Sequence, residues 1–208
     1  MKTTTEKISE AVVRRLPVYL RYLTELMGNG VQTVSSQDLG RRLDLNPAQI
    51  RKDLAYFGDF GKKGIGYDVE YLIEKIRHIL KLDRDIAVVL IGAGNLGKAL
   101  SNYNAYLNDN MRIVALFDSQ PDIIGTAINN LTVQPMEKMA ATVQAQHIRV
   151  GIMTVPGSEA QQVADDLVEA GVEAILSFAP AILKVREGIR VHYADFTTEL
   201  QSLAYYLE

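Results

Sequence analysis

The feature that most constrains this fold is a short apolar run that leads directly into a glycine-rich turn. Residues 86–91 (Ile-Ala-Val-Val-Leu-Ile) are continuously apolar, which is typical of a strand buried in a parallel sheet. The turn that follows is Gly92-Ala93-Gly94-Asn95-Leu96-Gly97. We expect Gly92 to permit a tight turn, Gly94 to let the backbone approach a pyrophosphate, and Gly97 to pack a helix closely on the strand. The pattern therefore predicts a βαβ unit with a dinucleotide site, whose first contacts are these six residues.

An acidic residue at the end of the next predicted strand supports the same site. Residues 112–117 form that strand, and Asp118 closes it, 21 residues after Gly97. A carboxylate here can accept hydrogen bonds from the adenosine ribose hydroxyls and would repel the 2′-phosphate of NADP, so NAD is favoured. The alternative is a Rossmann-like domain whose glycine turn holds no dinucleotide.

Two further strand ends are candidates for the same ligand. Thr154, Val155 and Pro156 follow the strand predicted at residues 148–153, and Phe178 ends the one predicted at residues 173–178. Ligands of open α/β sheets bind beyond the carboxyl ends of strands, so these residues could contact the adenine or the nicotinamide. Ordinary turns with a packed Phe178 are the alternative.

The rest of the second half alternates between strand and helix patterns. Further strands are predicted at residues 131–133 and 190–193, and helices near residues 136–145, 159–170 and 197–207. This alternation predicts an α/β fold with a doubly wound parallel sheet. The polar segment 81–85 marks the expected boundary with the first half.

The composition excludes several classes of site. The chain has 208 residues and no cysteine, which excludes disulfides, thiol catalysis and cysteine-based zinc sites. The first residues lack the apolar core of a secretory signal, and the longest apolar runs are too short to span a bilayer. We therefore expect a soluble cytoplasmic protein with no membrane partner.

Residues 1–80 show helical periodicity instead. Apolar residues at spacings of three and four between residues 8 and 27 predict an amphipathic helix, which we expect Pro17 to kink or restart. Ser35 and Asp38 have the spacing of a capping box that begins a second helix. A further helix is predicted at residues 69–80, with Leu72 and Ile76 on its apolar face.

The third helix and the turn after it are typical of a winged helix-turn-helix. Asn46 and Pro47 begin the helix, with Gln49 completing a second capping box, and Ile50, Leu54 and Phe57 form its inner face. Four glycines between residues 58 and 66 predict a β-hairpin. The outer face of the helix carries Ala48, Arg51, Lys52, Ala55 and Tyr56, and the hairpin carries Lys62 and Lys63.

The charge distribution agrees with a nucleic-acid partner for the first half. Residues 1–80 carry 13 basic and 10 acidic side chains, whereas residues 81–208 carry 9 and 15. Small residues let a helix enter the major groove, and basic side chains beside them reach phosphates or guanine edges. The candidate DNA contacts are Ser35, Ser36, Gln49, Arg51, Lys52, Tyr56, Lys62 and Lys63. The alternative is a solvated helix face beside a structural turn.

No catalytic constellation is apparent. His78, His147 and His192 fall in three separate predicted elements, and none forms a metal or triad pattern with its neighbours. A nicotinamide dehydrogenase normally needs a base or proton relay near the hydride, and no residue can be nominated for it. We expect no enzymatic activity and no metal.

Four stretches together make the chain similar to the Rex family of redox-sensing transcriptional repressors. They are Tyr19-Leu20-Arg21, the segment Gln49-Ile50-Arg51-Lys52-Asp53-Leu54-Ala55-Tyr56-Phe57-Gly58, Gly64-Ile65-Gly66-Tyr67, and the glycine turn at residues 92–97. The segments at residues 176–180 and 194–196 also fit. Ser177 departs from the asparagine expected at its position, which puts a side-chain role there in doubt.

The resemblance implies the following organisation and activity. Residues 1–80 would form a winged-helix DNA-binding domain, residues 81–194 a Rossmann NAD(H)-binding domain, and residues 195–208 a helix swapped onto the partner of a homodimer. The protein would bind palindromic operator DNA when NADH is scarce and release it when NADH binds, with NADH and NAD⁺ as regulatory ligands. An uncharged reduced ring fits a buried apolar pocket better than a cationic oxidised one, so such sensing needs no thiol.

By the same family match, Arg21, Tyr103 and Asp195 would meet as a switch. An arginine–carboxylate pair is geometrically specific and is readily made or broken by a domain rotation. An ordinary interfacial salt bridge is the alternative. For the whole chain, the competing hypotheses are an NAD-dependent oxidoreductase with a helical appendage and a regulator that senses a CoA-type nucleotide.

Overall fold

The computed structural model describes residues 8–58, 61–62, 66–103 and 110–207. The chain divides into two compact units, Met1–Asp83 and Arg84–Glu208. The division lies within the polar segment 81–85. Each unit has its own apolar core and is described by itself.

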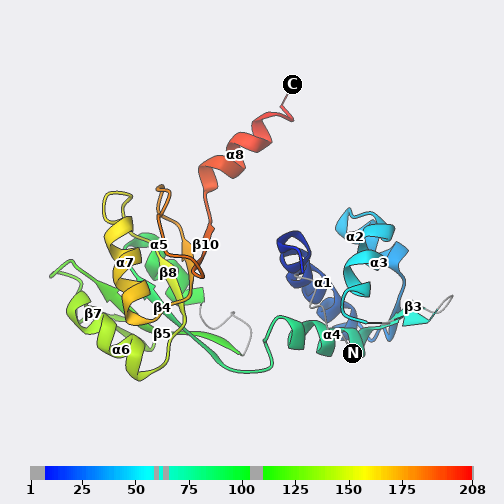
Figure 1. Ribbon diagram of the computed structural model, residues 1–208, viewed down its shortest axis with the longest axis horizontal. Helices are drawn as coiled ribbons and strands as arrows, with labels where there is room; N and C mark the ends of the chain where they lie inside the picture. The colour runs from blue at the N-terminus through cyan, green and yellow to red at the C-terminus, as the bar shows by residue number, and fades with distance from the viewer. Residues whose placement is uncertain (1–7, 59–60, 63–65, 104–109, 208) are drawn as a thin grey trace. The chain divides into compact units, whose positions relative to one another are not determined.

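The first unit is a helical bundle with a small antiparallel sheet (Figure 1). Helix α1 (Glu10–Gly28) packs along α4 (Val69–Ile79), and α2 (Ser36–Leu43) packs along α3 (Pro47–Ala55). Strands β1 (Thr33–Val34), β2 (Gly61–Lys62) and β3 (Gly66–Asp68) form a sheet in the order β1-β3-β2. A helix-turn-helix followed by a β-hairpin is the predicted winged-helix arrangement, and the structure confirms it.

The first helix differs from its prediction at Pro17. Helix α1 runs through Pro17 as one continuous element, so the expected restart is wrong. Proline lacks the N–H that would bond to the carbonyl of Val13. Pro17 and Val13 both lie on the exposed face of the helix, where water can satisfy that carbonyl. The two-residue strand β1 was not predicted, because two residues carry no periodicity.

The second unit is a seven-stranded sheet with six parallel strands. The strand order is β10-β9-β8-β4-β5-β7-β6, and only β6 pairs antiparallel among the strands described. The strands are β4 (Ile86–Ile91), β5 (Met111–Asp118), β6 (Ala127–Ile128), β7 (Leu131–Pro135), β8 (Val150–Met153), β9 (Ala174–Ser177) and β10 (Arg190–Tyr193). The helices are α5 (Asn95–Asn102), the 3₁₀ helix η2 (Met136–Lys138), α6 (Met139–Ala145), α7 (Ala160–Ala170) and α8 (Phe196–Ala204). This confirms the doubly wound sheet; the short edge strand β6 was not predicted.

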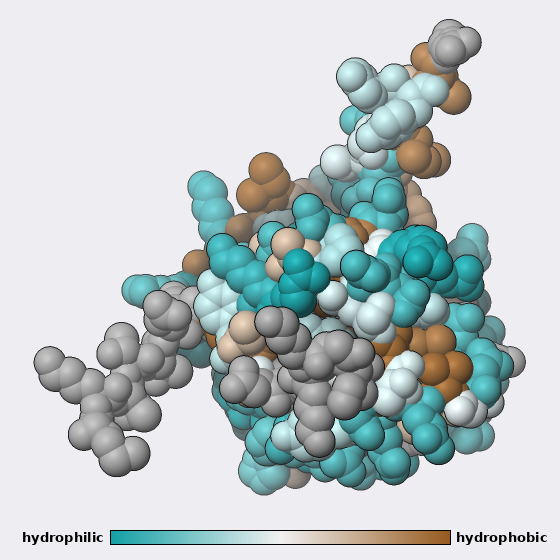
Figure 2. Space-filling view, turned by 90° about the vertical axis from the view of Figure 1, so that its right-hand side faces the viewer, coloured by the Kyte–Doolittle hydropathy of each residue, from teal (hydrophilic) through white to brown (hydrophobic). Residues whose placement is uncertain are grey.

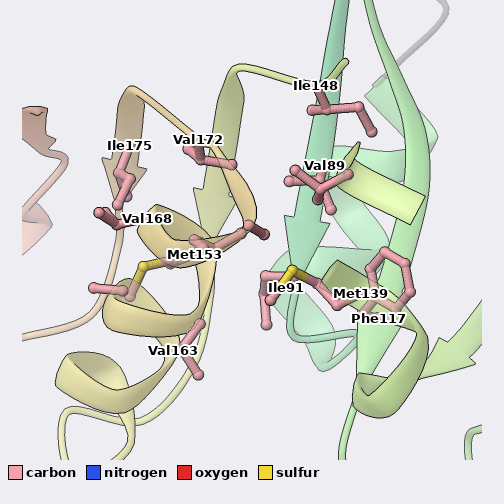
Figure 3. Close-up of a cluster of buried hydrophobic side chains, with 14 of the residues drawn as sticks. Val89, Ile91, Phe117, Met139, Ile148, Met153, Val163, Val168, Val172 and Ile175 are labelled. Atoms are coloured by element: carbon pink, nitrogen blue, oxygen red, sulfur yellow. The ribbon is translucent and has the colours of Figure 1, made fainter. Parts of the chain in front are cut away.

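The two faces of the sheet bury alternate residues of β4. Val89 and Ile91 contribute to the larger core, beneath helices α6 and α7 (Figure 3). Val88 and Leu90 contribute to the opposite core, which includes Leu100 of α5. Successive side chains of a strand point to opposite faces, so a continuously apolar strand needs helices on both sides.

Helix α8 stands apart from the sheet. It extends away from β10 (Figure 1), and none of its residues is buried. Phe196, Leu200 and Leu203 are each more than half exposed, and apolar residues follow one side of the projecting helix (Figure 2). Among the helices described, none is both long enough and apolar enough to cross a membrane.

Candidate functional site

In the turn after β4, Gly92 and Gly97 lie too close to neighbouring atoms for any side chain, whereas Gly94 faces open space. Gly92 has a φ of +98°, and a Cβ there would lie 2.7 Å from the carbonyl oxygen of Thr154. A Cβ on Gly97 would lie 1.9 Å from the carbonyl oxygen of Gly92. Apart from Gly94, its two chain neighbours and the backbone of α5, no atom of the described residues lies within 4 Å of the place a Cβ on Gly94 would take. The geometry therefore leaves open space for a ligand beside Gly94, whereas Gly92 and Gly97 have no room for a side chain.

The start of α5 is suited to an anion. Gly94 is the N-cap residue of this helix, and no side chain from the described part of the chain caps it. The first N–H groups of a helix lack intrahelical partners and carry the positive end of the helix dipole. A phosphate placed beside Gly94 could accept hydrogen bonds from these N–H groups and would be attracted by the positive end of the helix dipole.

The turn is anchored by the ends of two neighbouring strands. Asp118, at the end of β5, accepts the N–H of Ala93 on Oδ2 at 2.5 Å and the N–H of Gln120 on Oδ1 at 2.8 Å. Thr154, directly after β8, donates its hydroxyl to the carbonyl of Gly92 at 2.7 Å. Asp118 is only 8% exposed, and each carboxylate oxygen keeps a second lone pair. The acid can thus hold the turn and still accept a hydrogen bond from a ligand.

A cavity of about 440 Å³ opens where these strands end. It lies between β4 and β8, the neighbours at which the strand order reverses, and this is where ligands of doubly wound sheets bind. Its size is in the range of small-molecule sites. Of the predicted residues, Gly92, Gly94, Asp118, Thr154, Val155 and Pro156 line it.

The other predicted cofactor residues lie outside this lining. Ala93 is buried, and Gly97 packs against the turn itself. Asn95 and Leu96 are exposed on the first turn of α5. Phe178 packs against Phe196 of α8, with 6.5 Å between ring centroids.

Several lining residues were missed by sequence reasoning. These residues come from loops and from the first turns of helices around the cavity: Ser119, Gln120, Ile123, Met136, Glu159 and Val163. They follow β5, β7 and β8, and that position after a strand end was the one signal that could have found them. Apolar residues outside a motif do not otherwise differ from core residues in a sequence.

In the first unit, the described candidates for DNA contact lie at the start of α2, on or directly after α3, and in β2. Arg51, Lys52 and Tyr56 are exposed on or directly after α3, and Arg51 Nη1 donates to the hydroxyl of Ser36 at 2.9 Å. Ser35 is the N-cap residue of α2, where its hydroxyl accepts the N–H of Asp38 at 3.1 Å. Gln49 is half-buried. Lys62 lies in β2, and Lys63 lies outside the described residues.

A buried carboxylate lies on the other side of α3. Asp53 is 0% exposed and accepts hydrogen bonds from Arg15 and Tyr19 of α1 and from the amide of Gln49. Burial alone would raise the pKa of Asp53, but these hydrogen bonds hold it below its ordinary value. Burial and the bond to Asp53 raise the pKa of Tyr19. Its spacing from Ile50, Leu54 and Phe57 places Asp53 on the inner face, a signal that sequence reasoning missed.

The three predicted switch residues are divided between the units. Arg21 is exposed on α1 of the first unit, whereas in the second unit Tyr103 is the C-cap residue of α5 and Asp195 is the N-cap residue of α8. Asp195 accepts the Thr198 hydroxyl at 2.7 Å and the Thr197 N–H at 2.9 Å, which lowers its pKa. Their meeting stays a prediction. In the described ranges, no three side chains of metal-ligating type come together.

Two family models match successive parts of the chain. One, described as "Putative DNA-binding protein N-terminus", matches residues 7–55. The other, described as "CoA binding domain", matches residues 83–181. Each falls largely within one of the two units.

Curated relatives match along nearly the whole chain. A redox-sensing transcriptional repressor Rex from Brevibacillus brevis is 59% identical over 97% of this chain and 98% of its own length. A protein of the same name from Roseiflexus sp. is 48% identical over 97% of this chain and 92% of its own length.

Solved structures give the same result. RSP, a Rex-family repressor, in complex with NAD⁺ and operator DNA has a TM-score of 0.91 and 38% identity, over 96% of this chain and 92% of that one. RSP in complex with NADH has a TM-score of 0.87 and 36% identity, over 99% of this chain and 95% of that one.

Proposed function

This chain belongs to the Rex family of redox-sensing transcriptional repressors, and from that premise we propose how its two units divide the work. The first unit binds palindromic operator DNA, and the second binds NADH and NAD⁺ as regulatory ligands. NADH releases the protein from the operator. The observation that carries the proposal is the joint presence, in one chain, of an exposed recognition helix and a dinucleotide-type turn at the switch point of a parallel sheet.

The geometry around Gly94 fits a dinucleotide. The open space at this residue and the uncapped start of α5, within the described chain, suit a pyrophosphate. Asp118 is placed for the adenosine ribose, and its negative charge disfavours a 2′-phosphate. Ile123, Met136 and Val163 supply apolar surface in the same cavity. We therefore assign the adenosine half of the coenzyme to this cavity.

Discrimination between the two redox states rests on charge. The oxidised nicotinamide ring is cationic and the reduced ring is neutral, so an apolar enclosure favours NADH. The chain has no cysteine, so no thiol can take part in sensing. To act as a switch, NADH must bind the DNA-incompetent arrangement more tightly, with a coupling of roughly 1–3 kcal/mol.

DNA binding is assigned to α3 and the hairpin that follows. Arg51 and Lys52 are exposed on α3, beside Ala48 and Ala55, and small residues let the helix approach base edges. Lys62 and Lys63 supply positive charge for phosphates. A repressor acts where the chromosome is, so we also propose a cytoplasmic location.

Helix α8 supports a homodimer. Phe196 packs against Phe178, but Phe196, Leu200 and Leu203 all remain more than half exposed, and none of the helix is buried. A second copy that received this helix would remove those side chains from water. A paired molecule also matches a palindromic operator, because two-fold symmetric proteins bind two-fold symmetric sites. The switch residues Arg21, Tyr103 and Asp195 are proposed to meet in that dimer.

The test is a titration followed by fluorescence anisotropy. The full-length protein is mixed with a labelled palindromic duplex that it has selected from a random-sequence library, and NADH or NAD⁺ is added. We expect release by NADH at far lower concentration than by NAD⁺. Binding should weaken steeply with salt, because phosphate contacts release counterions. A complex that persists when NADH saturates the protein would contradict the proposal.

A second candidate function follows from the family model of the second unit. Its description as a CoA binding domain suggests another adenosine nucleotide as the signal, since CoA also presents an ADP moiety. Isothermal titration of the full-length protein with CoA and with NADH separates the two. Tight CoA binding with weak NADH binding would favour the second candidate.

A further inference from the structure

Among the described residues of the first unit, Asp53 is the one charged side chain buried in the apolar core, and it is the centre of a hydrogen-bond network. Arg15 donates from Nε to Oδ2 of Asp53 at 2.6 Å and from Nη2 to Oδ1 at 2.8 Å. The Tyr19 hydroxyl donates to Oδ2 at 2.7 Å, and the Gln49 amide donates to Oδ1 at 2.6 Å. Four donors thus meet the two oxygens of one carboxylate.

The network joins two pairs of helices. Arg15 and Tyr19 lie on α1, which packs along α4, and Gln49 and Asp53 lie on α3, which packs along α2. Apolar contacts between the pairs are non-directional and tolerate small changes of angle. A bidentate arginine–carboxylate pair fixes both distance and orientation. The buried directional link between the pairs, among the described residues, is therefore this carboxylate. Arg42 of α2 and Glu25 of α1 also form an ion pair at 3.5 Å, but both side chains are exposed, and such pairs contribute little.

Stability alone is a poor reason for a charge at this position. Asp53 is fully buried, and the side chain of Arg15 is 25% exposed. Replacing such a pair with apolar residues of similar size is often neutral or stabilising, because the charges need no desolvation. Apolar residues would not, however, fix the distance and the angle between α1 and α3 at single values.

The fixed helix is the one whose outer face is proposed to meet DNA. Lys52 directly precedes Asp53 in α3, and Arg51 lies two residues before it. All three are on one helix, so a rotation of α3 about Asp53 would displace the exposed basic side chains. Base recognition depends on such placement, whereas contacts to phosphates tolerate more displacement.

We propose that Asp53 is a positioning residue for operator recognition: by holding Arg15 and Tyr19 of α1 and Gln49 of α3 on one carboxylate, it fixes the angle at which α3 is presented to DNA. The inference rests on the proposed function of α3. It also assigns Gln49 a role different from the predicted DNA contact, since its amide is committed to Asp53.

The experiment compares specific with non-specific DNA binding in folded variants. Asp53→Asn removes the charge and keeps the shape. The triple variant Arg15→Met, Tyr19→Phe, Asp53→Leu replaces three of the four network residues with apolar ones, keeps the half-buried Gln49, and leaves no buried charge. Each full-length variant is titrated with the duplex selected by the natural protein and with a scrambled duplex of the same length and composition. Circular dichroism melting establishes that the variants are folded.

We expect the ratio of specific to non-specific affinity to fall about tenfold in both variants, the size of one lost base contact. NADH affinity should not change, because its site lies in the other unit. Tyr19→Phe removes one hydrogen bond and should reduce the ratio by about threefold. Glu10→Gln is the matched control, because Glu10 forms an ion pair with Arg14 on the same helix α1 and has no link to α3 in the described structure.

Three outcomes would decide the matter. A folded triple variant with the natural protein's ratio would overturn the inference, since an apolar interface would then position α3 equally well. Should Asp53→Asn unfold, an unchanged ratio in Tyr19→Phe would also overturn it and leave Asp53 a purely structural residue. Failure of the natural protein to bind any selected duplex would instead contradict the proposed function.

Discussion

Each of the two units holds a carboxylate away from water, but in different ways. Asp118 of the second unit accepts two backbone N–H groups, from Ala93 and Gln120. Asp53 of the first unit accepts side-chain donors, from Arg15, Tyr19 and Gln49. Any sequence that folds into the turn presents these backbone N–H donors. A side-chain donor, by contrast, is present only if one particular residue type occupies its position.

The difference shows what each carboxylate is free to do. Asp118 lines a cavity and is 8% exposed, whereas Asp53 is fully buried. Backbone amides hold Asp118, and no cationic side chain of the described residues forms an ion pair with it, so its negative charge remains available to select a ligand. The charge of Asp53 is neutralised by Arg15, so it is suited to fixing geometry.

The largest effect is expected from Asp53→Ala. This change leaves Arg15 without its partner, and removing one partner of a buried ion pair costs about 3 kcal/mol or more. The measurement is urea unfolding of the full-length protein followed by circular dichroism, with hydrogen exchange of peptides from α1 and α3 to locate the loss. A loss no greater than that of Asp118→Ala would remove the contrast between the two acids.

A smaller effect, on a different quantity, is expected from Asp118→Ala. Loss of a charged acceptor for the ribose should weaken NADH binding by about 2 kcal/mol, or about thirtyfold. Calorimetric titration measures this, and operator affinity without NADH should stay unchanged. Unaltered NADH binding would show that Asp118 serves the turn alone.

Protonation of Asp53 at low pH should reduce the free energy of unfolding by less than Asp53→Ala does, because a protonated carboxyl still fills its site. The folded pKa of Asp53 lies below its ordinary value, so its charge contributes stability at pH values above the unfolded pKa. That contribution is lost as the pH falls through the folded pKa. Unfolding measured between neutral pH and strong acid should show a steeper loss in the natural protein than in Asp53→Asn. Equal slopes would contradict the assignment.

The smallest effect is expected from Glu10→Gln. Glu10 and Arg14 form an exposed pair one turn apart on α1, and such pairs contribute below about 0.5 kcal/mol. A thermal melt at low and high salt tests this. A loss comparable to that of Asp53→Ala would show that charge anywhere on α1, rather than the buried network, is what matters.

The surroundings of Asp118 could be predicted from the sequence, whereas those of Asp53 could not. The strand at residues 86–91, its glycine turn and Asp118 lie within 33 consecutive residues, and each has a local physical requirement. Asp53 has its main partner 38 residues earlier in the chain, and in the sequence it follows Arg51 and Lys52 like another surface charge. Its helical spacing from Ile50 and Leu54 could have placed it on the inner face, but the sequence could not indicate which donors would meet it.

The remaining differences have local causes. Strands β1 and β6 contain two residues each and are defined by their neighbours in the sheet. Helix α1 continues through Pro17, where both Pro17 and Val13, the residue whose carbonyl loses its N–H partner, are exposed. The apolar lining of the cavity, such as Ile123 and Met136, has the composition of an ordinary core. These features depend on tertiary neighbours that no local pattern specifies.

If α8 is received by a second copy, as proposed, its exposed apolar side makes protein concentration a variable in the behaviour of this protein. Leu200, Leu203 and Leu207 lie in water in a lone chain, and a helix this short has little reason to persist unaided. On dilution below the dissociation constant of a pair, the end of each chain would fray while both compact units stayed folded. A melting temperature or an operator titration for this protein should therefore be interpreted together with the protein concentration at which it was measured.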